Sequence, residues 1–110
     1  LARARTCDGI LLTDLEANDP RPTLLETLGH PFVVRGTSPR PGIPAVGTDN
    51  RAIGRLAIRH LNDFGHRRIL FHNVGRQLMA GEGRYQGFVE AARDRGIADE
   101  VVYEDAVYRE

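Results

Sequence analysis

Short apolar runs alternate with helix-like segments along this chain, and this alternation constrains the fold more than any other feature. Asp8 and Gly9 precede the run Ile10–Leu12, and Pro31 precedes a second run, Phe32–Val34. Short continuous apolar runs bounded by turn residues are typical of strands that a parallel sheet buries on both faces. The sequence therefore predicts two buried strands within its first third.

The segment between these two runs has the pattern of a short helix. Asp19 and Pro20 are suitable residues for its first turn, and Leu24, Leu25 and Leu28 lie on one helical face before a glycine. A strand, a helix and a strand within about 30 residues form a parallel unit, because parallel strands need a crossover connection.

The second half of the chain repeats this alternation. Asp49 and Asn50 can cap a longer helix, since both side chains accept hydrogen bonds from the first turn. Its apolar positions follow the helical repeat at Ile53, Leu56, Ala57, Leu61 and Phe64. A third apolar run follows at residues 69–71, and a further helix places Tyr85, Phe88, Val89 and Ala92 on one face. The whole pattern predicts an α/β fold with parallel strands.

A loop rich in proline and glycine, residues 36–44, followed by a fresh helix cap at Asp49, marks the best candidate for a domain boundary. We expect an extended piece at residues 45–47 and strands at about 9–13, 32–35, 69–73 and 101–103. The first two strands should lie in one sheet and the last two in another.

Charge and composition exclude several classes of protein. Fifteen basic residues, all arginine, balance 15 acidic ones over 110 residues, so there is no overall positive field to attract nucleic acid or an anionic membrane. Cys7 is the single cysteine and cannot form an internal disulfide, and no apolar run approaches the length of a membrane span. We expect a reducing compartment and, because the chain lacks an initiator methionine and stops just after a strand, a fragment of a longer protein.

Catalytic, metal and nucleotide signatures are weak. Gly81, Gly83 and Gly87 open a helix after a strand, but their spacing does not fit a dinucleotide-binding turn. The four histidines lack metal-ligand spacing. Asp14 and Glu16 suit a solvated loop, and Ser38 lacks the context of a nucleophile. We therefore expect no enzyme activity, cofactor or metal.

Two residues are candidates for ligand contact. Arg84 stands in the first turn of the expected second-half helix, where its donors can point over the carboxyl edge of the sheet; an exposed surface arginine is the alternative. His72 lies at the end of a strand, the position where open α/β sheets bind ligands.

Several segments resemble the effector-binding domain of the lac repressor family of bacterial transcription regulators. They are, in the family's order, residues 8–12, 29–34, 48–50 and 61–69, and then 84–88 with Arg84 and the Gly87–Phe88 pair. The stretch around Thr48–Asn50 and the helix end at 61–69 carries most of the resemblance, which covers nearly the whole chain.

The resemblance implies a periplasmic-binding-protein-like fold, a three-layer α/β sandwich with parallel sheets in which two lobes enclose a cleft. Residues 1–48 would be the later part of the first lobe and residues 49–110 the beginning of the second. The implied function is a cytoplasmic, dimeric repressor that binds a sugar, nucleobase or similar small effector. Operator DNA would be bound through a helix-turn-helix upstream of this chain.

The resemblance also implies roles for single residues. Arg84 matches an arginine that hydrogen-bonds effector hydroxyl or carbonyl groups, and Thr13 matches a strand-end position that faces the cleft. Asp14 follows it. Asp49 and Asn50 match the crossover between the lobes, where helix capping is the alternative to ligand contact. A departure from the family pattern at residues 72–74 affects the expected wall of the pocket.

Two other functions remain open at this point. A periplasmic solute-binding protein of a sugar transporter would have the same fold, and a doubly wound enzyme would need a signature that we do not find. Because each sheet is incomplete, we also expect the isolated chain to expose Ile10, Leu12, Ile69 and Phe71, or to bury them against another copy.

Overall fold

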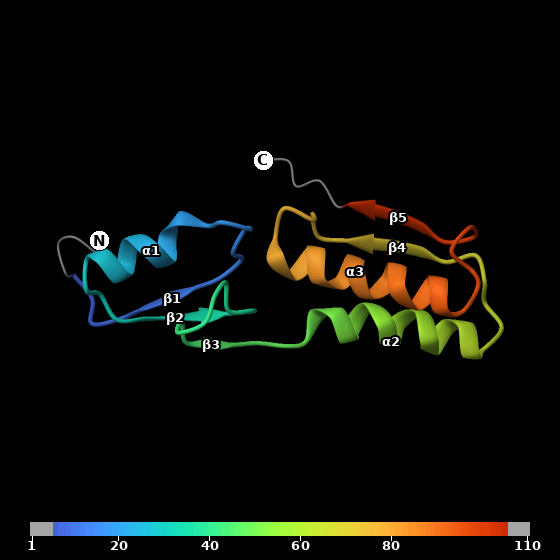
Figure 1. Cartoon of the computed structure of the whole chain (residues 1–110), viewed down its shortest axis with the longest axis horizontal. Coiled ribbons are helices and arrows are strands. Elements are labelled where there is room, and N and C mark those ends of the chain that lie inside the picture. Colours follow the sequence, from blue (N-terminus) through green and yellow to red (C-terminus); the bar gives the residue numbers. More distant parts are fainter. Residues whose placement is uncertain (1–5, 106–110) are drawn as a thin grey trace. The chain divides into compact units, whose positions relative to one another are not determined.

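The computed structural model describes residues 6–105, and the chain divides into two compact units that meet between Thr48 and Asp49 (Figure 1). The strands form two separate sheets, one in each unit. This confirms the prediction that the strands at 32–35 and 69–73 do not share a ladder.

The first unit is a three-stranded parallel sheet with one helix. Its elements are β1 (Ile10–Leu12), α1 (Pro20–Thr27), β2 (Phe32–Arg35) and β3 (Ala45–Val46). The strand order is β1-β2-β3, with Leu12 opposite Val34 and Val34 opposite Ala45. The piece expected to be merely extended at residues 45–47 is therefore a third strand.

Local chemistry explains where α1 begins and ends. The Asp19 carboxylate accepts a hydrogen bond of 3.0 Å from the backbone N–H of Arg21, which is the usual arrangement at a helix N-cap. Pro20 follows, where its missing N–H costs nothing. Gly29, at a φ of 64°, turns the chain out of the helix through a conformation that other residues rarely adopt.

The second unit contains two longer helices and two strands. They are α2 (Asn50–Asp63), β4 (Leu70–Asn73), α3 (Met79–Asp94) and β5 (Val102–Asp105). β4 and β5 pair in parallel, from Leu70 opposite Val102 to Asn73 opposite Asp105, and α3 is the crossover between them. The final strand thus begins one residue later and ends two residues later than predicted.

The core of the second unit lies between its sheet and its helices. Ile58 of α2, Phe88 and Ala92 of α3, and Ile69 and Ile97 beside the strands are all buried. The rings of Phe71 and Phe88 meet edge to face with 4.9 Å between their centroids. The predicted apolar face of α3 is confirmed at Phe88 and Ala92.

The strands are buried on one face, not on both as expected. Leu12 and Ile69 are buried, but Leu11 is 61% exposed and Leu70 is 59% exposed. The predicted exposed set, Ile10, Leu12, Ile69 and Phe71, was therefore wrong: Leu12 and Ile69 are buried, and Ile10 and Phe71 are half-buried. Successive strand residues point to opposite faces, and the helices of each unit decide which face is covered.

The orientation of α2 also differs from the prediction. Its buried residues are Asn50, Gly54 and Ile58, whereas Ile53, Leu56 and Phe64 of the expected apolar stripe are exposed. α2 turns its glycine face toward α3, because a position without a side chain permits the closest approach of two helices. Leu24 of α1 is likewise exposed, whereas Leu25 is buried.

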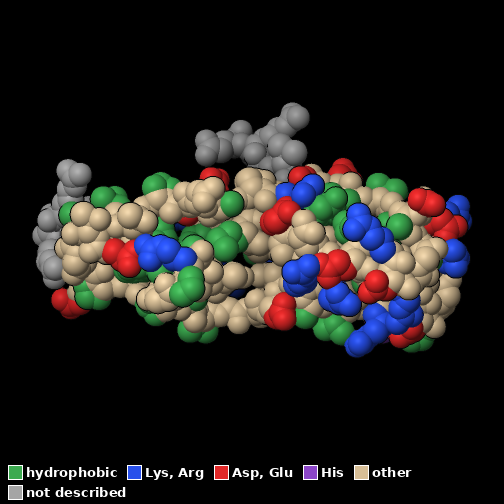
Figure 2. Space-filling model, viewed as in Figure 1, with side chains coloured by type: hydrophobic (Ala, Val, Ile, Leu, Met, Phe, Trp, Pro, Cys, Tyr) green, Lys and Arg blue, Asp and Glu red, His purple; other side chains and the backbone are tan. Residues whose placement is uncertain are grey.

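The charged surface of the second unit mixes both signs (Figure 2). Arg55 of α2 reaches Glu90 and Asp94 of α3, and Arg95 pairs with Asp63. This pattern agrees with the zero net charge of the chain. Within residues 6–105, no helix is long and apolar enough to cross a membrane.

Candidate functional site

The carboxyl edge of β4 and β5 is where a parallel α/β unit binds ligands, because strand ends and helix N-termini meet there. Asn73 is the last residue of β4, and Asn50 is the first residue of α2. The following contacts show that Arg84 and Tyr103 join them at this edge.

Arg84 lies in α3, half-buried, and its Nε donates a hydrogen bond of 3.1 Å to Oδ1 of Asn50. Within residues 6–105 this is its one side-chain hydrogen bond, so its η nitrogens have no partner there. The expected place of Arg84 in the first turn was wrong. The helix begins at Met79, so Arg84 is in the second turn.

Glycines bring Arg84 and Asn50 together. A Cβ atom at Gly54 of α2 would lie 2.1 Å from the carbonyl oxygen of Arg84, and one at Gly87 of α3 would lie 1.9 Å from that of Arg51. Contacts this short are impossible for a side chain, so only glycine allows the two backbones to touch. Gly83 and Gly87 therefore serve the packing of α3 against α2, and not a nucleotide-binding turn. Gly83 lies against Asn50.

Asn73 ties the end of β4 to the start of α3. Its side chain is buried, and its amide nitrogen donates to the carbonyl oxygen of Gly81 at 2.9 Å and to the hydroxyl oxygen of Tyr103 at 3.2 Å. Both amide N–H groups are thereby used. This bonding fixes the spacing between strand and helix at the edge.

Tyr103 is held in its protonated form. Burial, together with a hydrogen bond that the hydroxyl donates to the neighbouring carboxylate of Asp105, raises the pKa of Tyr103 to about 12. Its ring meets that of Tyr85 edge to face, with 4.6 Å between centroids. At neutral pH the edge therefore presents a neutral phenol.

Arg76, in the loop between β4 and α3, has its guanidinium carbon 3.6 Å from the centre of the Tyr85 ring. It also pairs with Glu82 through Nε at 2.7 Å. The Arg76 guanidinium lowers the pKa of Glu82, with help from the Gln86 amide. This arginine is neutralised by its own neighbours, in contrast to Arg84.

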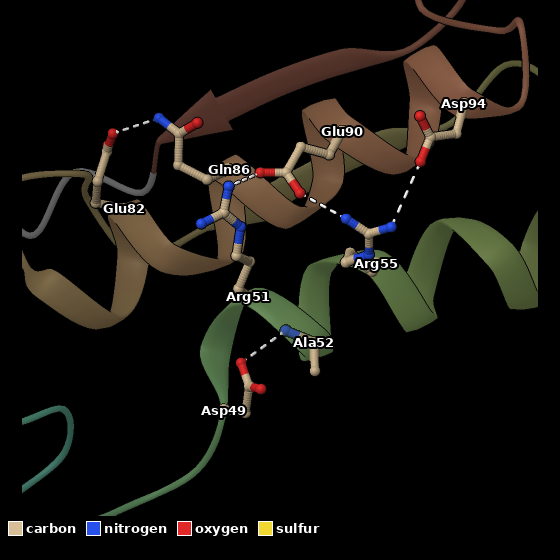
Figure 3. Close-up of polar contacts among 8 residues, drawn as sticks. All are labelled: Asp49, Arg51, Ala52, Arg55, Glu82, Gln86, Glu90 and Asp94. Carbon is tan, nitrogen blue, oxygen red and sulfur yellow. Dashed lines mark hydrogen bonds and ion pairs between the residues drawn. The ribbon is translucent and has the colours of Figure 1, made fainter.

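His72 and Asp49 are placed differently from Arg84. His72 is an exposed residue of β4 and points to the sheet face opposite to Asn73. Its Nδ1 lies 3.7 Å from Oε2 of Glu104. Asp49 accepts a hydrogen bond of 3.0 Å from the backbone N–H of Ala52, as a helix cap does (Figure 3). Among the described residues, neither side chain makes a hydrogen bond or an ion pair with Arg84.

Thr13 and Asp14 belong to the first unit, directly after β1. Their carbonyl oxygens accept hydrogen bonds from Nη2 of Arg21, at 3.0 Å and 3.4 Å. Asp14 has a φ of 55°, in the left-handed region. The same guanidinium holds the pKa of Asp19 well below its usual range. Arg21 thus fixes the backbone of the loop that carries both predicted site residues.

Sequence reasoning placed Asn50 at the crossover between the lobes and Asn73 in the expected wall of the pocket, but it did not pair either residue with a partner, and it missed Tyr103. The available signal was a polar residue at the end of an otherwise apolar strand, and an asparagine that directly follows a helix cap. Among residues 6–105 no three histidine, cysteine or acidic side chains form a group that could hold a metal ion.

A family model described as periplasmic binding proteins and sugar binding domain of the LacI family matches residues 1–106. The chain belongs to this family. The resemblance seen in the sequence is thereby confirmed, and so is the fold class, an incomplete α/β sandwich of the periplasmic-binding-protein type.

Named relatives of this LacI-family chain are transcriptional regulators. It is 37% identical to the regulator CelR of Thermobifida fusca over 92% of this chain, and 36% identical to AglR of Rhizobium meliloti (strain 1021) over 88% of it. These matches cover 32% of CelR and 28% of AglR, so the chain spans about a third of the length of these regulators.

Solved structures of the family agree. A complex of CelR with cellobiose matches 96% of this chain and 34% of that protein, with a TM-score of 0.75 and 34% identity. A transcription regulator-like protein from Staphylococcus haemolyticus matches 94% of this chain and 40% of that protein, with a TM-score of 0.83 and 26% identity.

Proposed function

We propose that this chain is part of the effector-sensing module of a LacI-family transcriptional repressor. The module binds a sugar or similar small molecule and changes the affinity of the repressor for its operator. In this proposal residues 1–48 belong to the first lobe and residues 49–110 begin the second, which agrees with the division of the structure at Thr48 and Asp49.

The observation that carries the proposal is the state of Arg84. Its guanidinium is anchored at one end, and its η nitrogens, which have no partner among the described residues, lie at the edge where a parallel sheet binds ligands. Sugars present pairs of hydroxyl oxygens, and a planar guanidinium suits such pairs. Thr13 and Asp14 are the proposed contacts of the first unit, while His72 and Asp49 stay predictions that single alanine variants test.

Ligand binding acts by population shift. An effector that binds one relative orientation of the lobes more tightly than another shifts the equilibrium toward that orientation. The homodimer transmits the shift to DNA-binding segments outside this chain, and affinity for operator changes by the same coupling free energy. The repressor works in the cytoplasm and catalyses no reaction. The names of the relatives favour a regulator over a transporter's solute-binding protein.

The test uses the full-length protein and the DNA upstream of its own gene. Fluorescence anisotropy measures operator binding with and without cellobiose, maltose, sucrose or arabinose, and calorimetry measures binding of each sugar. We expect one sugar to bind and to change operator affinity. Specific DNA binding that no sugar alters, together with no sugar binding, would contradict the proposal.

Arg84→Ala sharpens this test. A hydrogen bond to a charged group contributes about 1.5–3 kcal/mol, so sugar binding should weaken by about tenfold to a hundredfold. Operator binding without sugar should not change. Arg59→Ala is the matched control, because Arg59 is an exposed α2 arginine with no side-chain partner among residues 6–105. Equal sugar affinity in the folded Arg84 variant would return this arginine to an ordinary surface role.

A further inference from the structure

We propose that Asn50 is the positioning residue for Arg84: its amide oxygen holds Nε and thereby aims the η nitrogens at the effector. The inference rests on the proposed effector-sensing function. Asn50 does not touch the effector in this proposal; it acts through the arginine.

The burial of Asn50 means that its side chain needs a hydrogen-bond partner within the protein, and Arg84 is that partner. It is the first residue of α2 and is only 6% exposed. A buried amide that lacks a hydrogen bond destabilises the fold, so buried polar side chains are almost always paired. Among the residues that the structure describes, no buried side-chain nitrogen or oxygen lacks a partner. The Arg84 Nε–H supplies the partner for Oδ1 of Asn50.

The position of the bond on the guanidinium matters. An arginine is long and rotamer-rich, and fixing it on ligand binding costs conformational entropy. A bond at Nε fixes the plane of the guanidinium before the ligand arrives while it leaves the outer edge of the fork open. Part of the entropic cost of binding is then already met in the free protein.

The scaffold around the pair is stiff. Gly54 and Gly87 hold the backbones of α2 and α3 in contact, and a Cβ at Gly83 would lie 3.1 Å from that of Asn50. Asp49 caps the helix directly before Asn50. Arg84 is therefore fixed relative to the first turn of α2, which is also where the segment that joins the two units enters the helix.

A double-mutant cycle in the full-length protein tests the inference. Asn50→Leu removes the acceptor with little change in size, and Asn50→Asp retains it. The probe is the sugar from the cellobiose, maltose, sucrose and arabinose panel that the unaltered protein binds. We expect Asn50→Leu to weaken binding by about threefold to tenfold, as loss of one neutral acceptor would. Asn50→Asp should stay within about threefold of the unaltered protein.

The Arg84→Ala background separates positioning from a structural role. There, Asn50→Leu should cost less than about twofold, because no arginine is left to position. Equal losses in both backgrounds would overturn the proposal. Asn62→Leu is the matched control: Asn62 also lies on α2, and its Oδ1 accepts a hydrogen bond of 3.3 Å from Arg95, the residue directly after α3. It should leave sugar affinity unchanged. If Asn50→Leu does not fold, Asn50→Ala takes its place.

A second readout needs no sugar. Nuclear magnetic resonance of the deuterated full-length protein should show the Arg84 Nε–H protected from exchange with solvent. The protection should disappear in Asn50→Leu and persist in Asn50→Asp and Asn62→Leu. If no sugar binds, the proposed function fails while this measurement still tests the pair. An unprotected Nε–H in the unaltered protein would overturn the positioning role of Asn50.

Discussion

Gly54 of α2 lies against the backbone of Arg84 so closely that a Cβ atom at Gly54 would stand 2.1 Å from the Arg84 carbonyl oxygen. The atom it would meet is backbone, which cannot swing aside as a side chain can. One of the two tightest backbone contacts between the two helices therefore occurs at the residue that we propose recognises the effector.

Gly54→Ala should destabilise the full-length protein. Alanine gains about 0.5–1 kcal/mol over glycine in a helix interior, but forcing two packed helices apart costs about 1–3 kcal/mol, so the clash prevails. We expect a lower urea midpoint. Gly9→Ala is the control, since its Cβ would lie 3.8 Å from the carbonyl oxygen of Pro31. A Gly54 variant as stable as the control would show that the helices are not in contact.

Asp19→Ala should destabilise the first unit by about 0.5–2 kcal/mol, the usual cost of losing an N-cap. Arg21 lowers the pKa of Asp19 in the folded state. The stabilisation by the Asp19 carboxylate is therefore complete above the pKa of this group in the unfolded chain, about 4. It declines as the pH falls toward the lower pKa of the folded state.

Urea unfolding of the full-length protein at pH 7 and at acidic pH measures this difference. The gap between the unaltered protein and Asp19→Ala should narrow as the pH falls. Asp8→Ala is the control, because Asp8 is exposed and makes no side-chain hydrogen bond among residues 6–105. A gap that widens in acid would contradict the assignment.

Glu90→Gln should have a small effect although Glu90 contacts both Arg51 and Arg55 (Figure 3). Both arginines are largely exposed, and surface ion pairs contribute up to about 1 kcal/mol. Salt screens such pairs, so the loss should shrink at high ionic strength. Asp99→Asn, which alters an exposed side chain without a partner among the described residues, should show no salt-dependent loss. A large loss in stability that salt leaves unchanged would mean that the ion pairs of Glu90 are buried.

Tyr103→Phe should remove an ionisation near pH 12 from an alkaline titration. The pKa of Tyr103 is raised to about 12, so its contribution to stability is complete below the unfolded value of about 10 and is lost as pH rises through about 12. Phenolate absorbance after rapid mixing, before the chain unfolds, records the transition. The Tyr85→Phe variant should keep the ionisation near pH 12. If that ionisation persists in Tyr103→Phe, it does not belong to Tyr103.

Local patterns in the sequence were sufficient for the three helices and for every strand except β3, which the sequence predicted only as an extended piece. The apolar runs at 10–12 and 32–34, the proline near the start of α1 and the cap at Asp49 depend on neighbouring residues only. Capping and turn chemistry act over a few residues, so their signals can be read from the chain itself. The family resemblance added the periplasmic-binding-protein type of the fold and a ligand-binding role for Arg84, which the sequence pattern had already made a candidate.

The direction in which each element faces required the tertiary structure. Ile10, Leu11 and Leu12 are all apolar, yet Leu12 is buried while Leu11 is exposed, because successive strand residues point to opposite faces and the described part of the first unit has a single helix, α1, to cover one of them. Most of the expected apolar stripe of α2 is likewise exposed, because α2 packs against α3 through Gly54. A helix face that packs through a glycine such as Gly54 cannot be recognised from the spacing of apolar residues.

The candidate site shows the same division. The sequence by itself determined that an arginine follows the third strand and that Asp49 and Asn50 begin a helix. Only the tertiary structure paired Asn50 with Arg84, which lies 34 residues away along the chain, and Asn73 with Tyr103, 30 residues away. Such contacts depend on how helices and strands pack, and packing is decided by the whole unit, not by the residues beside each partner.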